Sequence, residues 1–527
     1  MKKMSFILCL FIFYAHLSSS AQQLDWAIST GGIFKVAVDG QGNSISIGTF
    51  SDTANVDLDP GPGTFMLPGD VTSHGDGLFI LKLGPGGAFK WARQILTNLG
   101  APGCAMALDT IGNIYLCGSF VNSGDFLGTT LNASGLSSDI YILRIDTAGN
   151  LDWLKKIGSG AVASDHGYAV AATGDGIVAT GWLGGAADVD PGVGVVTASN
   201  GWLMLKLDFS GNYSWHRQAG GTSLAINEAG VIYTAGPVLN SWQYDLCKYD
   251  SAGQIVWTRS FTDIAPELAA DVSGVYATGV FRFTPDFDPG PGTHIVASAG
   301  DYDNFVLKLD PDGQYKWVVI HGSAGFDSGL DIQLDHEGGI YVTGFFEHTI
   351  DFDPSSNIDQ ATADSNDIFI QKLDTMGNHL WVKVITGPSD DRCHSIALDT
   401  ANSIYLAGYG DNADLDPGGG VVSFPAANLR FDGYLAKWNL PFAAAVNNLS
   451  ATKPPVVIYP NPSNGKLVVS STEAISQLIA YDVTGRLVHF LQHGSKQSEL
   501  SIETNGVYFI HITTKDGSFI EKVVVNR

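Results

Sequence analysis

The stretch that decides the fold lies at residues 303–317, where the sequence reads DNFVLKLDPDGQYKW. An apolar run with Lys308 in it precedes an Asp-x-x-Gly turn, and the residues after the turn lead to Trp317. Asp and Gly supply the backbone angles that a tight chain reversal demands. The stretch therefore predicts a β-hairpin, with Lys308 on its first strand and Trp317 on its second.

Versions of this hairpin recur along the chain. Their tryptophans stand at positions 26, 91, 153, 215, 257, 317 and 381. A second hairpin follows each of them, as at residues 396–408, so one repeat makes a four-stranded unit. The shortest repeat, from Trp215 to Trp257, has 42 residues, which is close to the ~40 to 45 of one propeller blade. The extra residues of the longer repeats are expected to form a loop between the second and third strands.

Counting the strands predicts how the ring closes. The Lys-type strand occurs seven times, centred on Lys82, Arg144, Lys206, Lys248, Lys308, Lys372 and Lys437. Trp26 has no such strand before it, and Lys437 has no Trp-type strand after it. If the strand around Trp26 pairs with residues 432–439, the chain closes a ring and hides the edges that an open repeat exposes. We therefore expect an all-β seven-bladed β-propeller over residues 22–440.

The recurring order Gly-Asn-x-Tyr, Asp-x-Asp-Pro-Gly, apolar–Lys–apolar, Asp-x-x-Gly and Trp resembles the SBBP-type beta-propeller repeats of secreted bacterial proteins. The resemblance covers about residues 24–440. It implies the propeller fold but no single activity, because fold alone does not give function.

Acidic loops carry the most distinctive chemistry of the repeats. Five of them contain an Asp-x-Asp-Pro segment, with the paired carboxylates at Asp57 and Asp59, Asp188 and Asp190, Asp286 and Asp288, Asp351 and Asp353, and Asp414 and Asp416. In an extended segment both carboxylates face one side, and the apolar residue between them can dock on the sheet. Two interpretations stay open. Calcium prefers such oxygen ligands, but Asp and Pro equally serve a solvated edge in which Asp accepts backbone N–H bonds and Pro ends strand pairing.

Charge and the N-terminus indicate where the protein works. The chain carries a formal net charge of −25, which repels polyphosphates and argues against a nucleic-acid partner. Residues 1–21 have two lysines, an apolar core and a small-residue cleavage site, as in a secretory signal peptide. That apolar run is too short to cross a hydrocarbon layer about 30 Å thick, and no later segment is long enough. We expect a secreted or surface-attached protein with no transmembrane segment in its mature chain.

The C-terminus reads as a separate module. Residues 441–455 form a linker rich in Pro, Ala and Asn, and residues 456–527 alternate as a small antiparallel β-sandwich. Four blocks within it, YPNPSNG at 459–465, YDVTGR at 481–486, GVYF at 506–509 and KVVV at 522–525, resemble the C-terminal sorting domain of the type IX (Por) secretion system. The resemblance implies that this module is an export address read by the type IX machinery.

Function remains the open question at the level of sequence. No His-Glu-x-x-His, Gly-x-Ser-x-Gly or phosphate-binding loop is present. The favoured prediction is a non-catalytic binding or adhesion module, whose acidic face meets an extracellular glycan, a protein or calcium. The alternative is an enzyme acting on extracellular polysaccharide, with carboxylates at the channel mouth as acid and base.

Overall fold

The computed structural model describes residues 23–526, apart from residues 31, 51–55, 68–76, 136, 161–162, 240, 336, 356, 364, 411–412, 417–432, 440–455, 462, 483–486, 503 and 515–516. The predicted signal peptide (1–21) and linker (441–455) lie outside these residues. The chain divides into two compact units, Met1–Pro441 and Phe442–Arg527. Every regular element in the described part of the chain is a β-strand, which confirms the all-β class.

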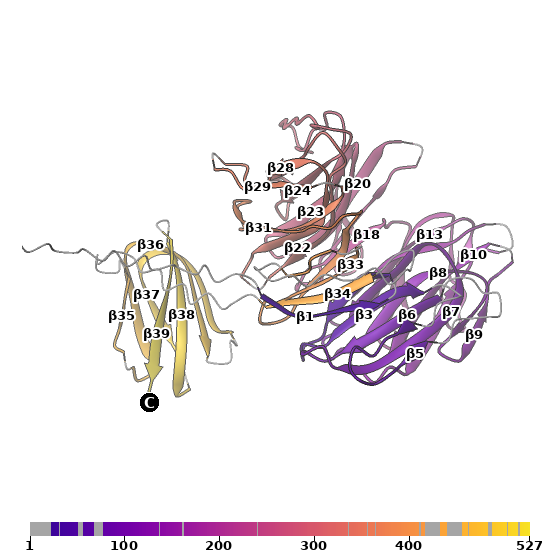
Figure 1. Ribbon diagram of the computed structural model, residues 1–527, viewed down its shortest axis with the longest axis horizontal. Coiled ribbons are helices and arrows are strands. Elements are labelled where there is room, and N and C mark those ends of the chain that lie inside the picture. The colour runs from indigo at the N-terminus through magenta and orange to yellow at the C-terminus, as the bar shows by residue number, and fades with distance from the viewer. Residues whose placement is uncertain are drawn as a thin grey trace, which may run out of the picture. The chain divides into compact units, whose positions relative to one another are not determined.

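The first unit consists of antiparallel sheets whose strands follow chain order (Figure 1). One eight-stranded sheet contains β2 (Ile33–Val38), β3 (Ser44–Phe50), β6 (Gly77–Leu83), β7 (Phe89–Leu108), β8 (Ile114–Phe126), β9 (Thr129–Asn132), β10 (Ser138–Ile145) and β11 (Leu151–Ile157). It holds two repeats, because the first part of the long strand β7 pairs with β6 and its last part pairs with β8.

The following repeats each form a separate four-stranded sheet. These are β12 (His166–Ala172), β13 (Gly176–Leu183), β16 (Gly201–Asp208) and β17 (Tyr213–Arg217); β18 (Ser223–Ile226), β19 (Ile232–Pro237), β20 (Gln243–Tyr249) and β21 (Ile255–Thr262); β22 (Ile264–Asp271), β23 (Gly274–Phe281), β24 (Asp303–Leu309) and β25 (Tyr315–His321); and β26 (Ser328–Leu334), β27 (Ile340–Phe346), β30 (Asp367–Leu373) and β31 (His379–Ile385).

Short hairpins lie in the loops between second and third strands: β4 (Val56–Asp57) with β5 (Met66–Leu67), β14 (Ala187–Asp188) with β15 (Thr197–Ala198), and β28 (Thr349–Asp351) with β29 (Gln360–Thr362). The extra residues therefore fall where the repeat alignment placed them.

The last sheet of this unit is closed by the first strand of the chain. It contains β32 (Arg392–Leu398), β33 (Ile404–Tyr409), β34 (Gly433–Asn439) and β1 (Gln23–Thr30). Strand β1 runs antiparallel to β34, with Trp26 opposite Lys437 and Ile28 opposite Leu435. In Figure 1 the indigo strand β1 lies beside the orange strand β34. The predicted pairing of the two ends is confirmed.

The innermost strands contact one another in cyclic order. Strand β2 contacts β7, and the contacts continue from β7 to β12, β18, β22, β26, β32 and back to β2. The hydrophobic core lies between neighbouring sheets. Tyr115 and Ile140 of one sheet, for example, share a cluster with Val170 and Leu205 of the next, and all four side chains are buried. Cys104, Cys117, Cys247 and Cys393 are buried free thiols, so core burial rather than disulfide bonding stabilises this unit.

Six of the seven repeat tryptophans stack on the turn of the following repeat. Trp257 Nε1 donates a hydrogen bond to the Pro311 carbonyl oxygen at 3.0 Å, and its ring covers Gly313, where an added Cβ would meet the indole at 2.9 Å. Gly313 has a φ of 73°, a left-handed angle that favours glycine. Trp26, Trp91, Trp153, Trp215 and Trp317 cover Gly87, Gly149, Gly211, Gly253 and Gly377 in the same way. The motif that identifies the repeat is thus also the contact that joins one repeat to the next.

In the repeats of Lys82 and Lys372, the lysine of the Lys-type strand pairs with a buried aspartate of its own sheet. Lys82 Nζ lies 2.9 Å from Asp39 Oδ2, and both side chains are buried. Lys372 Nζ lies 2.9 Å from Asp335 Oδ2 and donates to the Tyr341 hydroxyl at 2.8 Å. Burial alone would lower the pKa of Lys372, but attraction to Asp335 and Tyr341, with the hydrogen bonds to both, together outweighs it and raises the value. The Lys-type strand is thereby bound to the turn between the first two strands of its sheet.

The second unit is a five-stranded antiparallel network. Its strands are β35 (Val456–Tyr459), β36 (Lys466–Asp482), β37 (Leu487–Ser501), β38 (Gly506–Thr514) and β39 (Gly517–Val525). Strand β36 is long, and its register against β37 shifts between Ser470 and Ile475. Buried residues including Val469, Ile510 and Val523 form a separate core.

The stacking of Trp257 on Gly313 predicts a measurable difference between two glycine variants. Gly128 has a similar φ of 86° but open space where a Cβ would lie, so Gly128→Ala tests the backbone angle alone. A left-handed residue costs about 1–2 kcal/mol in both variants. Gly313→Ala must also displace Trp257, and we expect it to unfold at a clearly lower urea concentration than Gly128→Ala. Equal midpoints would contradict the proposed contact between repeats.

Candidate functional site

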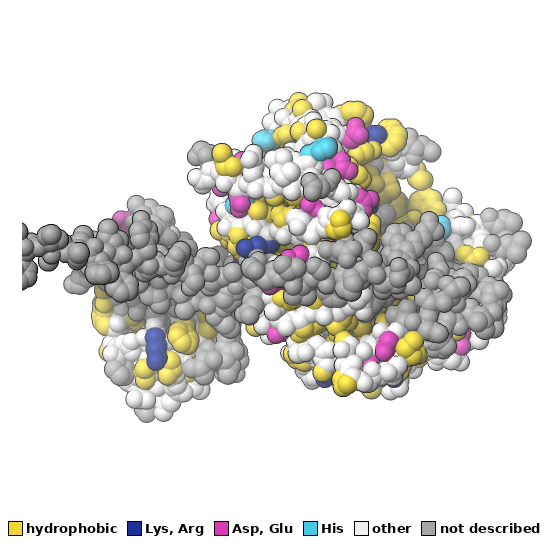
Figure 2. All heavy atoms as spheres, in the orientation of Figure 1, with side chains coloured by type: hydrophobic (Ala, Val, Ile, Leu, Met, Phe, Trp, Pro, Cys, Tyr) yellow, Lys and Arg dark blue, Asp and Glu magenta, His cyan; other side chains and the backbone are white. Residues whose placement is uncertain are grey.

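The loops that differ most in length between repeats lie at one edge of the sheets. Because neighbouring strands are antiparallel, the second strand of a sheet ends at the edge where the third and first strands begin. The loops between second and third strands and the connections between sheets therefore emerge on one face. We call it the loop face. In Figure 2 hydrophobic (yellow) and acidic (magenta) side chains are scattered over the visible described surface of this unit, with few basic ones.

The Asp-x-Asp-Pro loops have the alternation that the sequence predicts. The apolar residue between the two aspartates is buried in all five, namely Leu58, Val189, Phe287, Phe352 and Leu415. The flanking aspartates are exposed or half-buried. Phe287 packs edge-to-face against Phe281 and at a tilt against Phe305 of its own sheet, with ring centroids 5.2 and 5.5 Å apart. Each loop is thus anchored by its middle residue, while its carboxylates stay at the surface.

Both aspartates of a pair accept backbone hydrogen bonds within their own loop. Asp286 Oδ1 accepts from the amides of Asp288 at 3.0 Å and His294 at 2.7 Å. Asp288 Oδ1 accepts from the amide of Gly290 at 2.8 Å. The same three bonds recur at Asp57 and Asp59, at Asp188 and Asp190, and at Asp351 and Asp353. Asp414 accepts from the amide of Asp416 at 3.2 Å. The first aspartate therefore closes the loop, and the second shapes its turn.

These bonds account for the recurrence of the aspartates without a metal ion. Hydrogen bonds from Ser355 lower the pKa of Asp353, as expected of a carboxylate that caps a turn. Among the described residues, no group of three or more His, Cys, Asp or Glu side chains is arranged to hold a metal ion. Calcium binding by the ten aspartates stays a prediction.

Buried aspartates fix the connections between sheets on the same face. Asp327, between β25 and β26, is buried and accepts a hydrogen bond from the Glu347 amide at 2.9 Å. Asp165, before β12, accepts one from the Gly184 amide at 2.9 Å. Burial raises the pKa of Asp327 to about 6 and also raises the pKa of Asp165, against the hydrogen bonds. These carboxylates tie each connection to a loop of the following sheet.

Three charged residues of the innermost strands lie close together. Lys35 of β2 places Nζ 3.2 Å from Asp331 Oδ2 of β26. Asp331 Oδ2 also accepts from Ser395 Oγ at 2.9 Å and from the Ile396 amide at 3.1 Å. Burial alone would lower the pKa of Lys35, but attraction to Asp331 and Glu267 outweighs it and raises the value. We call Lys35, Glu267 and Asp331 the inner charged cluster.

Glu267 is the exposed member of this cluster. It lies on β22 and keeps an exposed side chain, although protein surrounds it on several sides. Desolvation by that surrounding protein raises the pKa of the Glu267 carboxyl to about 7, against attraction to Lys35. A carboxyl group of this kind can exchange a proton near neutral pH. The repeat alignment missed the cluster, because its members come from three different repeats and match no shared motif.

Two histidines at the first strands of their sheets, His166 and His394, lie against aromatic rings. His394 is an extra residue at a β-bulge of β32 and lies 5.3 Å from the Tyr409 ring. Burial, with nearby Arg392, lowers its pKa to about 4. His166 begins β12 and lies 6.2 Å from the Tyr168 ring. Among the described residues, neither histidine forms a hydrogen bond with a carboxylate, so neither has the partner that usually orients a catalytic base.

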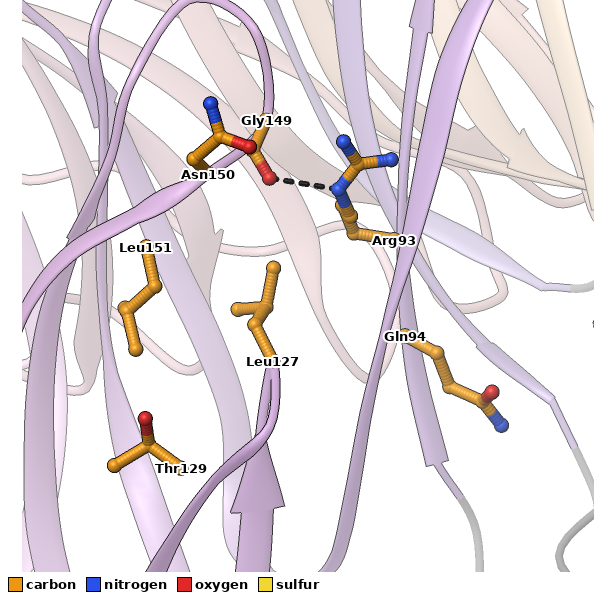
Figure 3. Close-up of a pocket in the computed structure, with 7 residues that line it drawn as sticks. All are labelled: Arg93, Gln94, Leu127, Thr129, Gly149, Asn150 and Leu151. Atoms are coloured by element: carbon orange, nitrogen blue, oxygen red, sulfur yellow. Dashed lines mark hydrogen bonds between the residues drawn. The ribbon is translucent and has the colours of Figure 1, made fainter.

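A cavity of about 460 Å³ lies between the first two repeats (Figure 3). Its lining residues are Arg93, Gln94, Leu127, Thr129, Gly149, Asn150 and Leu151. Arg93, the charged residue of this lining, donates from Nε to the Gly149 carbonyl oxygen at 2.7 Å. The cavity follows from the packing of one repeat on the turn of the next, and its lining holds no acid–base pair.

Comparisons with known proteins identify the two kinds of module. Residues 457–526 match the secretion system C-terminal sorting domain family. The C-terminal module is a type IX sorting domain. Residues 380–416 match the beta-propeller repeat family, which confirms both resemblances. The protein is therefore exported through the type IX secretion machinery and is secreted or held at the cell surface. No helix in the described ranges is long and apolar enough to cross a membrane.

Other comparisons match only part of the chain or match it with low scores. An uncharacterized WD repeat-containing protein of Acanthamoeba polyphaga mimivirus is 24% identical over 194 residues, which are 32% of this chain and 13% of that protein. The extracellular domain of a one-component system from B. thetaiotaomicron has 11% identity and a TM-score of 0.27, over 94% of this chain and 68% of that one. PorZ, a surface component of the type IX secretion system of Porphyromonas gingivalis, has 11% identity and a TM-score of 0.16, over 95% and 100% of the two chains.

The two interpretations of the acidic loops give opposite results for Asp188 variants. If Asp188 only closes its loop, Asp188→Asn keeps an acceptor oxygen and the stability of the protein. Asp188→Ala leaves two exposed amides to water and lowers stability by about 0.5–1.5 kcal/mol. We expect this order in thermal unfolding, and no shift of Tm with millimolar calcium or a chelator. A calcium-dependent rise in Tm that Asp188→Asn abolishes would instead establish the metal site.

Proposed function

We propose that residues 22–440 form a seven-bladed β-propeller, preceded by a signal peptide at 1–21. A linker at 441–455 joins it to a sandwich-like sorting domain at 456–527. The cyclic contacts of β2, β7, β12, β18, β22, β26 and β32 support the blade count. The pairing of β1 with β34 supports closure of the ring. The separate core of the C-terminal unit supports the domain division.

We further propose that the propeller is a non-catalytic binding module that works outside the cell. The observation that carries this proposal is the construction of the loop face. Its Asp-x-Asp-Pro loops are anchored by buried apolar residues and closed by their own hydrogen bonds, so they offer a preformed surface that loses little entropy on binding. The sorting domain brings this surface to the cell exterior. An extracellular glycan or protein is the class of ligand that such an address makes available.

The inner charged cluster supports a second candidate, an enzyme that acts on extracellular polysaccharide. Glycoside hydrolysis uses two carboxyl groups, one protonated as an acid and one ionised. Glu267, whose pKa the surrounding protein raises to about 7, and Asp331, which is paired with Lys35, are the two carboxyl groups of this cluster. This candidate needs a substrate to reach Glu267 from the loop face.

One experiment separates the two functions. We expect a polysaccharide embedded in the gel to slow the migration of the purified exported protein in affinity electrophoresis. We also expect the protein not to shorten the polysaccharide, because binding requires no proton transfer. Reducing ends are measured after prolonged incubation, with Glu267→Gln as the matched variant. Release of reducing ends that Glu267→Gln abolishes would contradict the binding function and establish the enzyme.

A further inference from the structure

The shortest repeat leaves a cluster of aromatic side chains uncovered on the loop face. The loop between β19 and β20 has no Asp-x-Asp-Pro segment, and it ends at Trp242, whose side chain is 75% exposed. Phe283, at the start of the next long loop, is 61% exposed. Large exposed rings of this kind are unusual on a soluble protein and mark binding surfaces when they lie together.

Arg282 holds these rings in one arrangement. Its guanidinium carbon lies 4.5 Å from the Trp242 ring centroid and 4.8 Å from that of Phe283. Nη1 donates to the Tyr302 hydroxyl at 3.1 Å, and Nε lies 3.8 Å from Asp263 Oδ1. An arginine that stacks on aromatic rings and also pairs with a carboxylate is restricted in orientation. The rings around it are therefore preorganised.

The backbone of this cluster is strained. Asp263 and Phe283 have φ values of 59° and 60°, left-handed angles that are rare for a residue as bulky as phenylalanine. The Asp263 amide donates to the Trp242 carbonyl oxygen at 3.0 Å, and the Arg282 amide donates to the Asp263 carbonyl oxygen at 3.2 Å. Strain of this kind persists where surrounding contacts fix it, and it concentrates at functional sites.

The cluster continues towards the next sheet. The Tyr302 and Phe326 rings lie 5.1 Å apart, and the two residues form a β-bridge. Phe326 is 36% exposed, and its amide donates to Glu347 Oε2 at 3.1 Å. We call Trp242, Arg282, Phe283, Tyr302 and Phe326 the aromatic arc. It extends from the short loop, along the following loop, to the connection between β25 and β26.

We propose that the aromatic arc is a binding site for a neutral linear glycan, which rests on the proposed binding function. The ring of a hexose has an apolar face that stacks on an aromatic side chain and hydroxyl groups that reach arginine, tyrosine and carboxylate partners. The charge of Arg282 is already balanced by Asp263, and the chain is strongly acidic. A neutral ligand fits these conditions better than an anionic one. Rings spread over successive loops fit several sugar units rather than one.

The test uses the full mature protein and linear oligosaccharides of glucose and mannose, from trimers to hexamers, in isothermal titration. We expect at least one hexamer to bind, and to bind more tightly than its trimer, because the arc has several rings. Trp242→Ala removes one stacking surface and should weaken binding about tenfold, with partial recovery in Trp242→Phe. Val272→Ala, a change at an exposed apolar residue of the turn between β22 and β23, should have no effect, because that turn lies at the edge of the sheet opposite the loop face.

A second variant keeps the test decisive if Trp242→Ala does not fold. Phe326→Ala, at the other end of the arc, should weaken the hexamer and leave the trimer unchanged. The proposal is overturned if no oligosaccharide binds at millimolar concentration, or if both variants bind normally. It is also overturned if an immobilised unfolded polypeptide binds through Trp242 while no sugar does, which would indicate a protein partner. Cleavage of the bound hexamer would contradict the non-catalytic function but leave the arc as its binding site.

Discussion

The hydrogen bonds between β1 and β34 are the constraint on which the rest of the first unit depends. Every other sheet is built from strands that follow one another in sequence, whereas this sheet joins residues 23–30 to residues 433–439. Without it, β34 and the adjoining sheets would expose unpaired edges, which tend to pair with other chains. With it, the strand that carries Trp26 is held where the tryptophan covers the turn at Gly87, and the loops are held on one face.

The sequence predicts the features that recur from one repeat to the next. The tryptophan spacing, the unmatched strands at Trp26 and Lys437, and the buried residue inside each Asp-x-Asp-Pro loop are all local patterns, and the structure agrees with them. The signal was strong because each pattern occurs several times in register. The role of the lysine was within reach too, since a charged residue inside an apolar strand needs a buried partner, and Asp39 supplies one for Lys82.

The candidate sites could not be predicted in the same way, because they break the repeat. Lys35, Glu267 and Asp331 come from innermost strands that are far apart in the chain, and only the cyclic arrangement of the strands brings them together. Trp242 and Phe283 meet around Arg282 because one repeat lacks the long loop that others have. The repetition of the motif drew attention to the aspartates, which close loops, and away from the irregular positions where unlike side chains converge.

Cross-linking of the two end strands tests closure of the ring most directly. Ala27 and Ala436 are opposite each other in the β1–β34 pairing, so cysteines at both positions lie within the range of a disulfide. After mild oxidation and proteolysis, the account predicts a disulfide-linked peptide pair containing positions 27 and 436, absent from either single variant, together with a higher unfolding midpoint in the oxidised protein. Free thiols at both positions in folded, oxidised protein would contradict it.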